Sequence, residues 1–401
     1  MRCARNGIGR IVCLVSAWLS LTVPLGAQCR VKLPKKLPDL EAAAQRDSDD
    51  AAAHYNVGVG YCAAGRYDDA EREFKLATAI EPQFAEPYLA LSQLPFARRS
   101  RLFDDQYAHS VPEEWVPRLK EADHMYVRAF LIDPFVDVKI IGAVTPHDFG
   151  VNAEIGEYYA EYFRDLLDGL DFFSEGKYDR AYTSFQRVYN ELNSAAHVDR
   201  LANYLLWYHG IAAGHIQKYD DAIWDIQTIL NRFEQAEKSD SLIRIPLQTN
   251  DYRYILACLK QRAGKLQDAA DLFRSALEHD AGLYVAHTRL AQLYESVQRW
   301  PVAIAERQAA VNANPDEPSL VYDLGVTLAK GAQWAQADST LRQAMAVNPR
   351  DSRVPYYLGI VEQQLGKKDE ARTAFQRFLA LAPSRYQVQI DNAKQRLAAL
   401  Q

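Results

Sequence analysis

The feature that most constrains this chain is a repeat of 34 residues in its C-terminal half. Four alanines keep that spacing: Ala269, Ala303, Ala337 and Ala371. Three prolines keep it too: Pro315, Pro349 and Pro383. A fixed period in this range is typical of stacked helical repeats, in which each unit packs only on its neighbours. Such arrays usually present an extended surface rather than a catalytic pocket.

Two positions of the repeat stay small in all eight units that the sequence predicts. Position 20 is alanine in each unit: Ala70, Ala122, Ala181, Ala222 and the four above. Position 8 is glycine, alanine or serine: Gly58, Ser92, Gly169, Gly210, Ala257, Ala291, Gly325 and Gly359. Position 24 is bulky except for Arg307, which we expect to weaken the sixth unit. The pattern predicts two closely packed helices per unit, because large side chains at the small positions would force the helices apart.

The turns between the paired helices repeat nearly the same residues. Gly65 and Gly176 are placed to end a first helix in a left-handed conformation. Asp68, Asp179 and Asp220 stand where a side chain caps the second helix. Helix capping is therefore a better interpretation of the adjacent aspartates in these turns than a catalytic pair of carboxylates.

These residues resemble the tetratricopeptide repeat family. The first unit carries six residues of the family pattern: Gly58, Tyr61, Ala70, Phe74, Ala77 and Pro82. The resemblance implies an all-α fold, an α-solenoid of about eight helix-turn-helix repeats in a right-handed superhelix. It also implies an N-terminal half-repeat, a C-terminal capping helix and a concave groove that binds a protein or peptide, without naming the partner.

The repeat frame divides the chain into units and flanking segments. The predicted units cover residues 51–84, 85–134 with an insert, 162–195, 203–236, 250–283, 284–317, 318–351 and 352–385. Residues 135–161 form an inserted linker that begins with strand-like alternation. A capping half-repeat is predicted over residues 39–50 and a capping helix over residues 386–401.

The first 27 residues have the layout of a secretory signal peptide. Arg2, Arg5 and Arg10 precede an apolar run over residues 11–25, and cleavage is predicted after Ala27. Residues 28–38 then form a linker. The sequence thus predicts export to the periplasm or the exterior with no membrane span in the mature chain; an N-terminal anchor on the envelope stays an alternative.

Few cysteines remain once the predicted signal peptide is removed. The mature chain would keep Cys29, Cys62 and Cys258. An odd number excludes a fully paired intramolecular framework. We therefore expect the fold to depend on packing rather than on disulfides.

Position 5 of the first helix is aromatic in five units. These residues are Tyr55, Trp207, Tyr254, Tyr322 and Tyr356. In the family this position tends to face the concave groove, so the rings predict a track for an extended peptide. The alternative is that the rings pack against neighbouring repeats.

The second unit contains a predicted contact surface of its own. Eighteen extra residues separate its two helices, and the insert is rich in arginine and aromatic side chains, the types enriched at interfaces. The candidate contact residues are Phe96, Arg98, Arg99, Phe103, Tyr107 and Trp115. A surface loop packed on its own repeat is the alternative.

No sequence motif supports catalysis, a cofactor or a metal site. The net charge of −6 gives no basic surface for nucleic acid. The sequence therefore predicts a non-catalytic interaction scaffold of the cell envelope or exterior that binds a protein or extended peptide. A module that binds glycans or envelope polymers is an alternative, since tyrosine and tryptophan also stack on sugar rings. An enzyme with residues supplied by the inserts is a weaker alternative, and the oligomeric state is left open.

Overall fold

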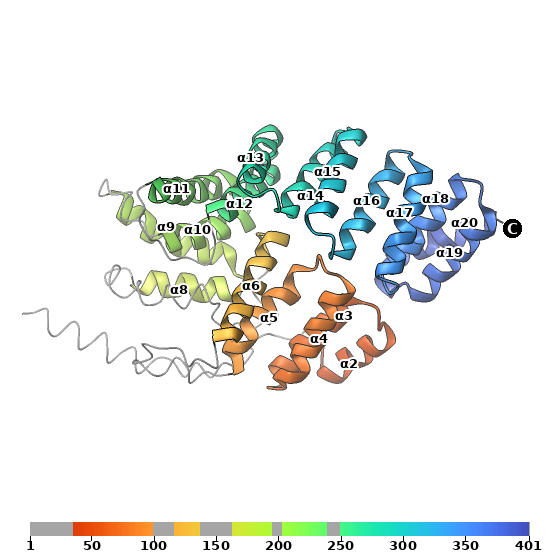
Figure 1. Ribbon diagram of the computed structural model, residues 1–401. Coiled ribbons are helices and arrows are strands. Elements are labelled where there is room, and N and C mark those ends of the chain that lie inside the picture. The colour runs from red at the N-terminus through yellow and green to blue at the C-terminus, as the bar shows by residue number, and fades with distance from the viewer. Residues whose placement is uncertain (1–34, 99–115, 137–162, 195–202, 239–248, 401) are drawn as a thin grey trace, which may run out of the picture.

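The computed structural model describes residues 35–98, 116–136, 163–194, 203–238 and 249–400, and all regular structure in them is helical (Figure 1). Eight antiparallel helix pairs follow one another: α3 (Ala51–Ala63) with α4 (Tyr67–Ile80), α5 (Ala85–Arg98) with α6 (Val116–Ile132), α8 (Phe163–Ser174) with α9 (Tyr178–Ser194), α10 (Asn203–His215) with α11 (Tyr219–Lys238), α12 (Thr249–Arg262) with α13 (Leu266–His279), α14 (Tyr284–Ser296) with α15 (Trp300–Ala313), α16 (Pro318–Lys330) with α17 (Trp334–Val347), and α18 (Arg353–Gln364) with α19 (Lys368–Leu381). The single helix α2 (Leu37–Arg46) packs before the first pair, while η5 (Ser384–Tyr386) and α20 (Gln387–Ala399) follow the last. The predicted all-α solenoid is confirmed.

The helices of a pair interlock where a small residue faces a large one. A Cβ atom added to Gly58 would lie 2.6 Å from the ring of Phe74, and one added to Gly359 would lie 2.8 Å from the ring of Phe375. Both rings are fully buried. Position 8 must therefore stay small because the side chain at position 24 occupies the space against its backbone.

Glycine closes several of the turns as the sequence predicts, but the aspartates do not cap the second helices. Gly65 has a φ of +74°, which is the left-handed conformation. Helix α4 already begins at Tyr67, and no side chain caps it. Asp68 and Asp69 lie in its first turn, where carboxylates interact favourably with the positive end of the helix dipole.

The stacked pairs curve round until the first lie beside the last. In Figure 1 the orange pairs of α2–α6 lie next to the teal and blue helices α14–α18. Arg350 and Arg385, near the C-terminal end, form ion pairs with Asp49 and Asp50 near the N-terminal end. The concave side of the later repeats thus faces the N-terminal repeats.

The cysteines depart from the sequence-based expectation in one respect. Cys62, on α3, is disulfide-bonded, and Cys258, on α12, is a buried free thiol. A disulfide therefore contributes to the fold in addition to packing.

Several predicted segments lie outside the described residues. They are the signal peptide, the insert from Arg99 to Trp115 and the inserted linker from residue 137 onward. Helix α5 runs through Pro95 to Arg98, so the backbone at Phe96 and Arg98 continues the first helix of its unit instead of leaving it.

Candidate functional site

The candidate site is the concave face of α12, α14, α16 and α18, where it meets the C-terminal end of α6. The last carbonyl groups of a helix lack partners within the helix. Tyr254 donates a hydrogen bond from its hydroxyl to the Leu131 carbonyl at 2.8 Å, and Arg289 donates one to the Ile132 carbonyl at 2.7 Å. The groove therefore binds main-chain atoms of a distant repeat.

Tyr254 and Arg289 also hold each other in place. Nε of Arg289 donates to the Tyr254 hydroxyl at 3.2 Å, so that hydroxyl accepts one hydrogen bond and donates another. Burial raises the pKa of Tyr254, which keeps its hydroxyl protonated and able to donate. The two side chains form a fixed donor pair aimed at the end of α6.

We call the contact between the concave face of α12–α18 and the end of α6 the meeting surface. Charged contacts extend it. Arg262 bonds the carboxylate of Asp133 at 2.8 Å and lies 3.9 Å from the centre of the Phe135 ring. Arg128, on α6, pairs with the buried Glu317 just before α16. Each contact joins residues more than a hundred positions apart in the sequence.

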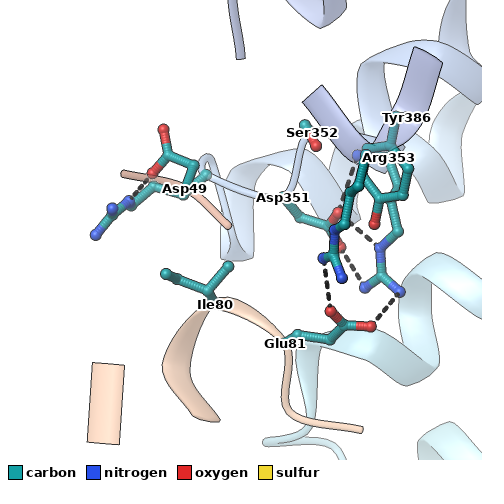
Figure 2. A pocket seen from close by; sticks show the side chains of 9 residues that line it. Asp49, Ile80, Glu81, Asp351, Ser352, Arg353 and Tyr386 are labelled. Atoms are coloured by element: carbon teal, nitrogen blue, oxygen red, sulfur yellow. Dashed lines mark hydrogen bonds and ion pairs between the residues drawn. The ribbon is translucent and has the colours of Figure 1, made fainter. Parts of the chain in front are cut away.

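The outer end of the meeting surface is an arginine-rich set of ion pairs, which we call the seam. Figure 2 shows Glu81, after α4, facing Arg353 on α18; Arg385 bonds the other Glu81 oxygen at 3.0 Å. Asp351 holds Arg353 through both of its oxygens, at 2.8 and 2.9 Å. The C-terminal side of the seam is cationic and the N-terminal side is acidic.

A cavity of about 200 Å³ lies between the two sides of the meeting surface. Its wall from the later repeats includes residues at positions 2, 5 and 9 of the repeat frame: Tyr254, Val285, Thr288, Gln292, Ser319 and Arg353. The N-terminal repeats close it with Gln83, Leu131 and Ile132. Of the five rings predicted at position 5, only Tyr254 is among the described residues that line this cavity, and the other lining side chains are not aromatic.

The five predicted groove rings pack within the solenoid. Trp207, Tyr254 and Tyr322 are 2%, 0% and 8% exposed, so a bound peptide cannot reach most of their surface in this arrangement. Tyr55 packs on Phe74 and Phe84, and Tyr356 donates a hydrogen bond to Asn392 of α20 at 3.1 Å. These contacts fit the packing alternative. Tyr55 and Tyr356 keep part of their surface exposed, and partner contact through them stays a prediction.

The predicted insert surface is not placed by the structure. Arg99, Phe103, Tyr107 and Trp115 lie outside the described residues, and the side chains of Phe96 and Arg98 do too. Their role in binding stays a prediction.

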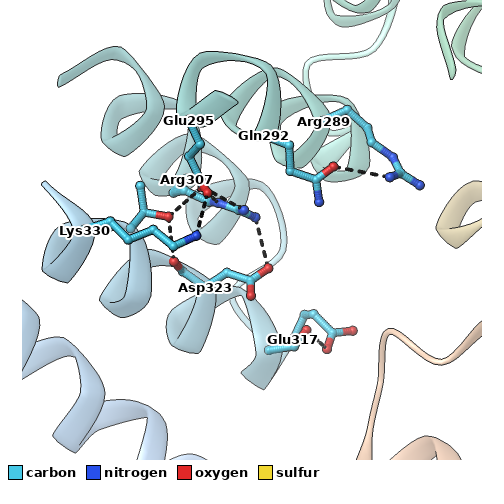
Figure 3. Close-up of polar contacts among 9 residues, drawn as sticks. Arg289, Gln292, Glu295, Arg307, Glu317, Asp323 and Lys330 are labelled. Carbon is cyan, nitrogen blue, oxygen red and sulfur yellow. Dashed lines mark hydrogen bonds and ion pairs between the residues drawn. The ribbon is translucent and has the colours of Figure 1, made fainter. Parts of the chain in front are cut away.

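Arg307 does not leave a defect in the sixth unit. Its guanidinium bonds Glu295 at 2.9 Å and Asp323 at 3.0 Å, and Lys330 joins Glu295 at 3.1 Å (Figure 3). Burial alone would raise the pKa of Glu295, but Arg307 and a hydrogen bond from Thr327 bring it below its usual value. A cluster of ion pairs around the buried Arg307 therefore replaces the apolar filling of the other units.

A second buried polar group lies in the fourth unit, around His209, whose place in the repeat frame indicates a packed histidine with hydrogen-bond partners. Nδ1 of His209 lies 2.6 Å from Asp225 and Nε2 lies 2.9 Å from Gln186. The rings of Tyr182 and Tyr189 stack on the imidazole. The position-8 glycine of this unit, Gly210, faces Asp225 instead of a large apolar side chain, a difference that the repeat pattern does not reveal.

Helix pairs stacked in this way define a helical-repeat solenoid, and sequence comparison identifies which kind. The sequence model described as "Tetratricopeptide repeat" matches residues 37–83, 254–318 and 322–386. These segments are tetratricopeptide repeats, and such repeats imply a scaffold for protein–protein interactions.

Similarity to individual proteins covers only parts of them. The chain is 32% identical over 98 residues to the cytochrome c-type biogenesis protein CycH of Bradyrhizobium diazoefficiens, a match to 24% of this chain and 27% of that protein. It is 31% identical over 116 residues to the protein O-mannosyl-transferase Tmtc1 of Drosophila melanogaster, 27% of this chain and 14% of that protein. Among solved structures, the C-terminal part of a repeat-containing protein from Cytophaga hutchinsonii is 15% identical with a TM-score of 0.46, covering 58% of this chain and 86% of that one.

None of the helices among the described residues is both long and apolar enough to cross a membrane. No group of three or more His, Cys, Asp or Glu side chains among these residues is placed to hold a metal ion.

Proposed function

We propose that the protein is an exported, non-catalytic scaffold that binds an acidic polypeptide segment in its concave groove. The observation that carries the proposal is the way the groove binds the end of α6. Tyr254 and Arg289 bond main-chain carbonyls, and Arg262 bonds the carboxylate of Asp133. Those contacts recognise the carbonyl end of a helix with an adjacent acidic residue, which a partner protein can also present.

In the structure the end of α6 occupies the groove, and we call this the closed arrangement. A partner segment therefore competes with residues 131–136 for the same arginines. The charge asymmetry favours acidic partners, because Arg350, Arg353 and Arg385 line the continuation of the groove. Electrostatic attraction of this kind speeds association and selects among partners more than it adds affinity.

Three observations support an exported location. The first residues have the charge and hydropathy pattern of a signal peptide. Cys62 is disulfide-bonded, and disulfides persist mainly in oxidising compartments. One partial relative is described as a cytochrome c-type biogenesis protein. Fractionation of cells that express the full chain tests this location, and retention of the uncleaved chain in the cytoplasm would contradict it.

The glycan alternative loses its main support, because it relied on exposed aromatic rings. Trp207 and Tyr254 are buried and cannot stack on a sugar in this arrangement. Peptide binding is therefore the function to test first.

The test uses a labelled peptide of residues 126–137 and fluorescence anisotropy. We expect it to bind the double variant Glu81→Gln, Asp133→Asn more tightly than the wild type, because losing the ion pairs of Glu81 and Asp133 frees the groove. Adding Arg289→Gln to that variant should remove binding, and a scrambled peptide is the control. If neither protein binds this peptide or an array of acidic peptides, groove recognition is wrong.

A further inference from the structure

Polar and charged side chains line the 200 Å³ cavity, and some of their polar atoms have no partner in the described part of the protein. Three charged side chains contribute to its described lining: Arg289, Asp323 and Arg353. Asp323 is bonded to Arg307, and Arg353 is bonded to Asp351 through two oxygens. Two of the three charges are thus neutralised by partners outside the cavity.

Arg289 is different. Its guanidinium bonds the Tyr254 hydroxyl, the Gln292 side-chain oxygen and the Ile132 carbonyl, all of them uncharged. Among the described residues no carboxylate lies within ion-pair distance of it, and Asp133 acts on it only through longer-range attraction while bonded to Arg262. Arg289 is half-buried and has no carboxylate partner among these residues, so an anion in the cavity would gain a favourable charge interaction with it.

Two further polar atoms in the lining are also unsatisfied. Oγ1 of Thr288, the residue directly before Arg289 on α14, is buried without a hydrogen-bond partner, and both residues line the cavity. Nε2 of Gln83 is buried on the opposite wall and approaches the Tyr284 hydroxyl without reaching hydrogen-bond geometry. Buried polar groups in native proteins almost always have partners, so these orphans indicate that a bound species completes the site.

We propose that this cavity binds a small organic monocarboxylate that bridges the N-terminal repeats and the groove. One unpaired guanidinium calls for one negative charge, and Arg289 offers the planar donors that a carboxylate prefers. Val285, Leu131 and Ile132 supply an apolar side for a short carbon skeleton. The volume suits a molecule of roughly six to ten non-hydrogen atoms, since a cavity of about 150 Å³ accommodates benzene.

Water alone is the alternative occupant, because a polar cavity of this size also holds several waters. The discriminating property is charge. Water and a neutral amide form ordinary hydrogen bonds with Arg289, whereas a carboxylate forms a stronger, charge-assisted hydrogen bond. The proposal goes beyond peptide binding, because the cavity exists only while the N-terminal repeats close the groove.

Titration calorimetry with pentanoate and benzoate tests the site on the full mature chain, with pentanamide and benzamide as uncharged counterparts of the same shape. We expect both acids to bind and both amides to fail. Arg289→Gln should weaken binding at least about tenfold, as expected for loss of a charge-assisted pair. Thr288→Val should weaken it about threefold without loss of stability, because the hydroxyl makes no bond in the protein. Arg274→Gln, exposed on α13, should bind like the wild type.

Arg289→Gln also removes a hydrogen bond between the groove and α6, so it can separate the N-terminal repeats from the groove. Thr288→Val removes no such bond, and weaker acid binding by this variant therefore reports on the cavity alone. Equal binding of acids and amides, or no binding of either acid to the folded wild type, overturns the proposal and leaves a water-filled cavity. Peptides with a free and an amidated C-terminus form a second arm: preference for the free terminus supports the carboxylate site and assigns its source to a chain end. The seam-weakened variant can bind peptide even if the acids do not bind, so failure here is distinguishable from failure of the proposed function.

Discussion

Within a repeat, Gly359 lets the ring of Phe375 pack directly on the backbone of α18, whereas between the ends of the solenoid Arg385 reaches Asp50 and Glu81 with charges that are partly exposed. The first kind of contact is apolar, buried and repeated along the chain. The second kind is polar and does not recur at a fixed spacing along the chain. Apolar burial is little affected by salt, while exposed ion pairs are weakened by it. The body of the solenoid should therefore persist under conditions that separate its ends.

The largest expected effect comes from emptying one of the packing positions. Phe375 is fully buried. Phe375→Ala should lower the free energy of unfolding by about 3–5 kcal/mol, because it removes a buried ring and leaves a cavity. Chemical denaturation followed by circular dichroism measures the change. Val388→Ala, 79% exposed on α20, is the matched control, and a similar loss in both variants would contradict the packing assignment.

A buried polar group inside a repeat gives a sharper, pH-dependent test. Burial raises the pKa of Asp225 to about 6 despite the opposing effect of His209. The unfolded chain loses this proton near the ordinary value of 3.8, so the contribution of Asp225 to stability is present below about pH 4 and is lost as pH rises to about 6. The loss amounts to about 3 kcal/mol at most, at 1.36 kcal/mol per pKa unit.

Asp225→Asn removes that titration while keeping the side-chain shape. Relative to this variant, the wild type should become less stable between pH 4 and 6 and then level off. Denaturation midpoints at several pH values measure the difference. Asp220→Asn, exposed on the same helix, should follow the wild type. Parallel curves for wild type and Asp225→Asn would show that Asp225 is not desolvated.

Overfilling the close contact between helices should have an intermediate effect. Ala337 is fully buried between α16 and α17, and the neighbouring Gln336 is exposed. Ala337→Leu should destabilise by about 1–3 kcal/mol through overpacking, whereas Gln336→Leu should change stability little. Thermal denaturation distinguishes the two, and equal effects would mean that the repeat frame is misassigned.

The sequence predicts the repeat contacts because they recur at a fixed spacing. Gly58 and Phe74, or Gly359 and Phe375, stand 16 residues apart in every such unit, so one pattern describes them all. The contacts between the ends have no such period: Tyr254 meets the carbonyl of a residue 123 positions away, and Arg350 meets one 302 positions away. Their partners depend on how far the solenoid curves, which is set by small angles summed over many repeats.

The candidate site shows the same limit at single positions. The aromatic pattern at position 5 favoured Trp207, which packs inward. Of the five predicted rings, only Tyr254 is among the described residues that line the cavity. Thr288 and Arg353 occupy the same frame positions as groove residues and contribute to the cavity, yet nothing in their local sequence marks them. Arg307 was visible as a departure, but its partners Glu295 and Asp323 become evident only in the folded chain.

The smallest effect on stability is expected at the seam. The same experiment tests whether the ends of the solenoid can separate reversibly. Exposed ion pairs contribute less than about 1 kcal/mol each. The Debye length falls from about 10 Å at 0.1 M salt to about 3 Å at 1 M, so high salt should weaken the contacts of Glu81 while leaving Phe375 unaffected. Small-angle X-ray scattering should then show a larger radius of gyration at high salt with unchanged helix content.

Glu81→Gln should produce part of that expansion at low salt, because Glu81 bonds Arg385 and faces Arg353 across the seam. Asp271→Asn breaks an exposed pair confined to α13 and should leave the radius unchanged. If neither salt nor Glu81→Gln expands the molecule, the hydrogen bonds from Tyr254 and Arg289 to the end of α6 suffice to hold the ends together. Closure would then depend on the buried donors instead of the exposed charges, and a partner would have to displace main-chain hydrogen bonds to enter the groove.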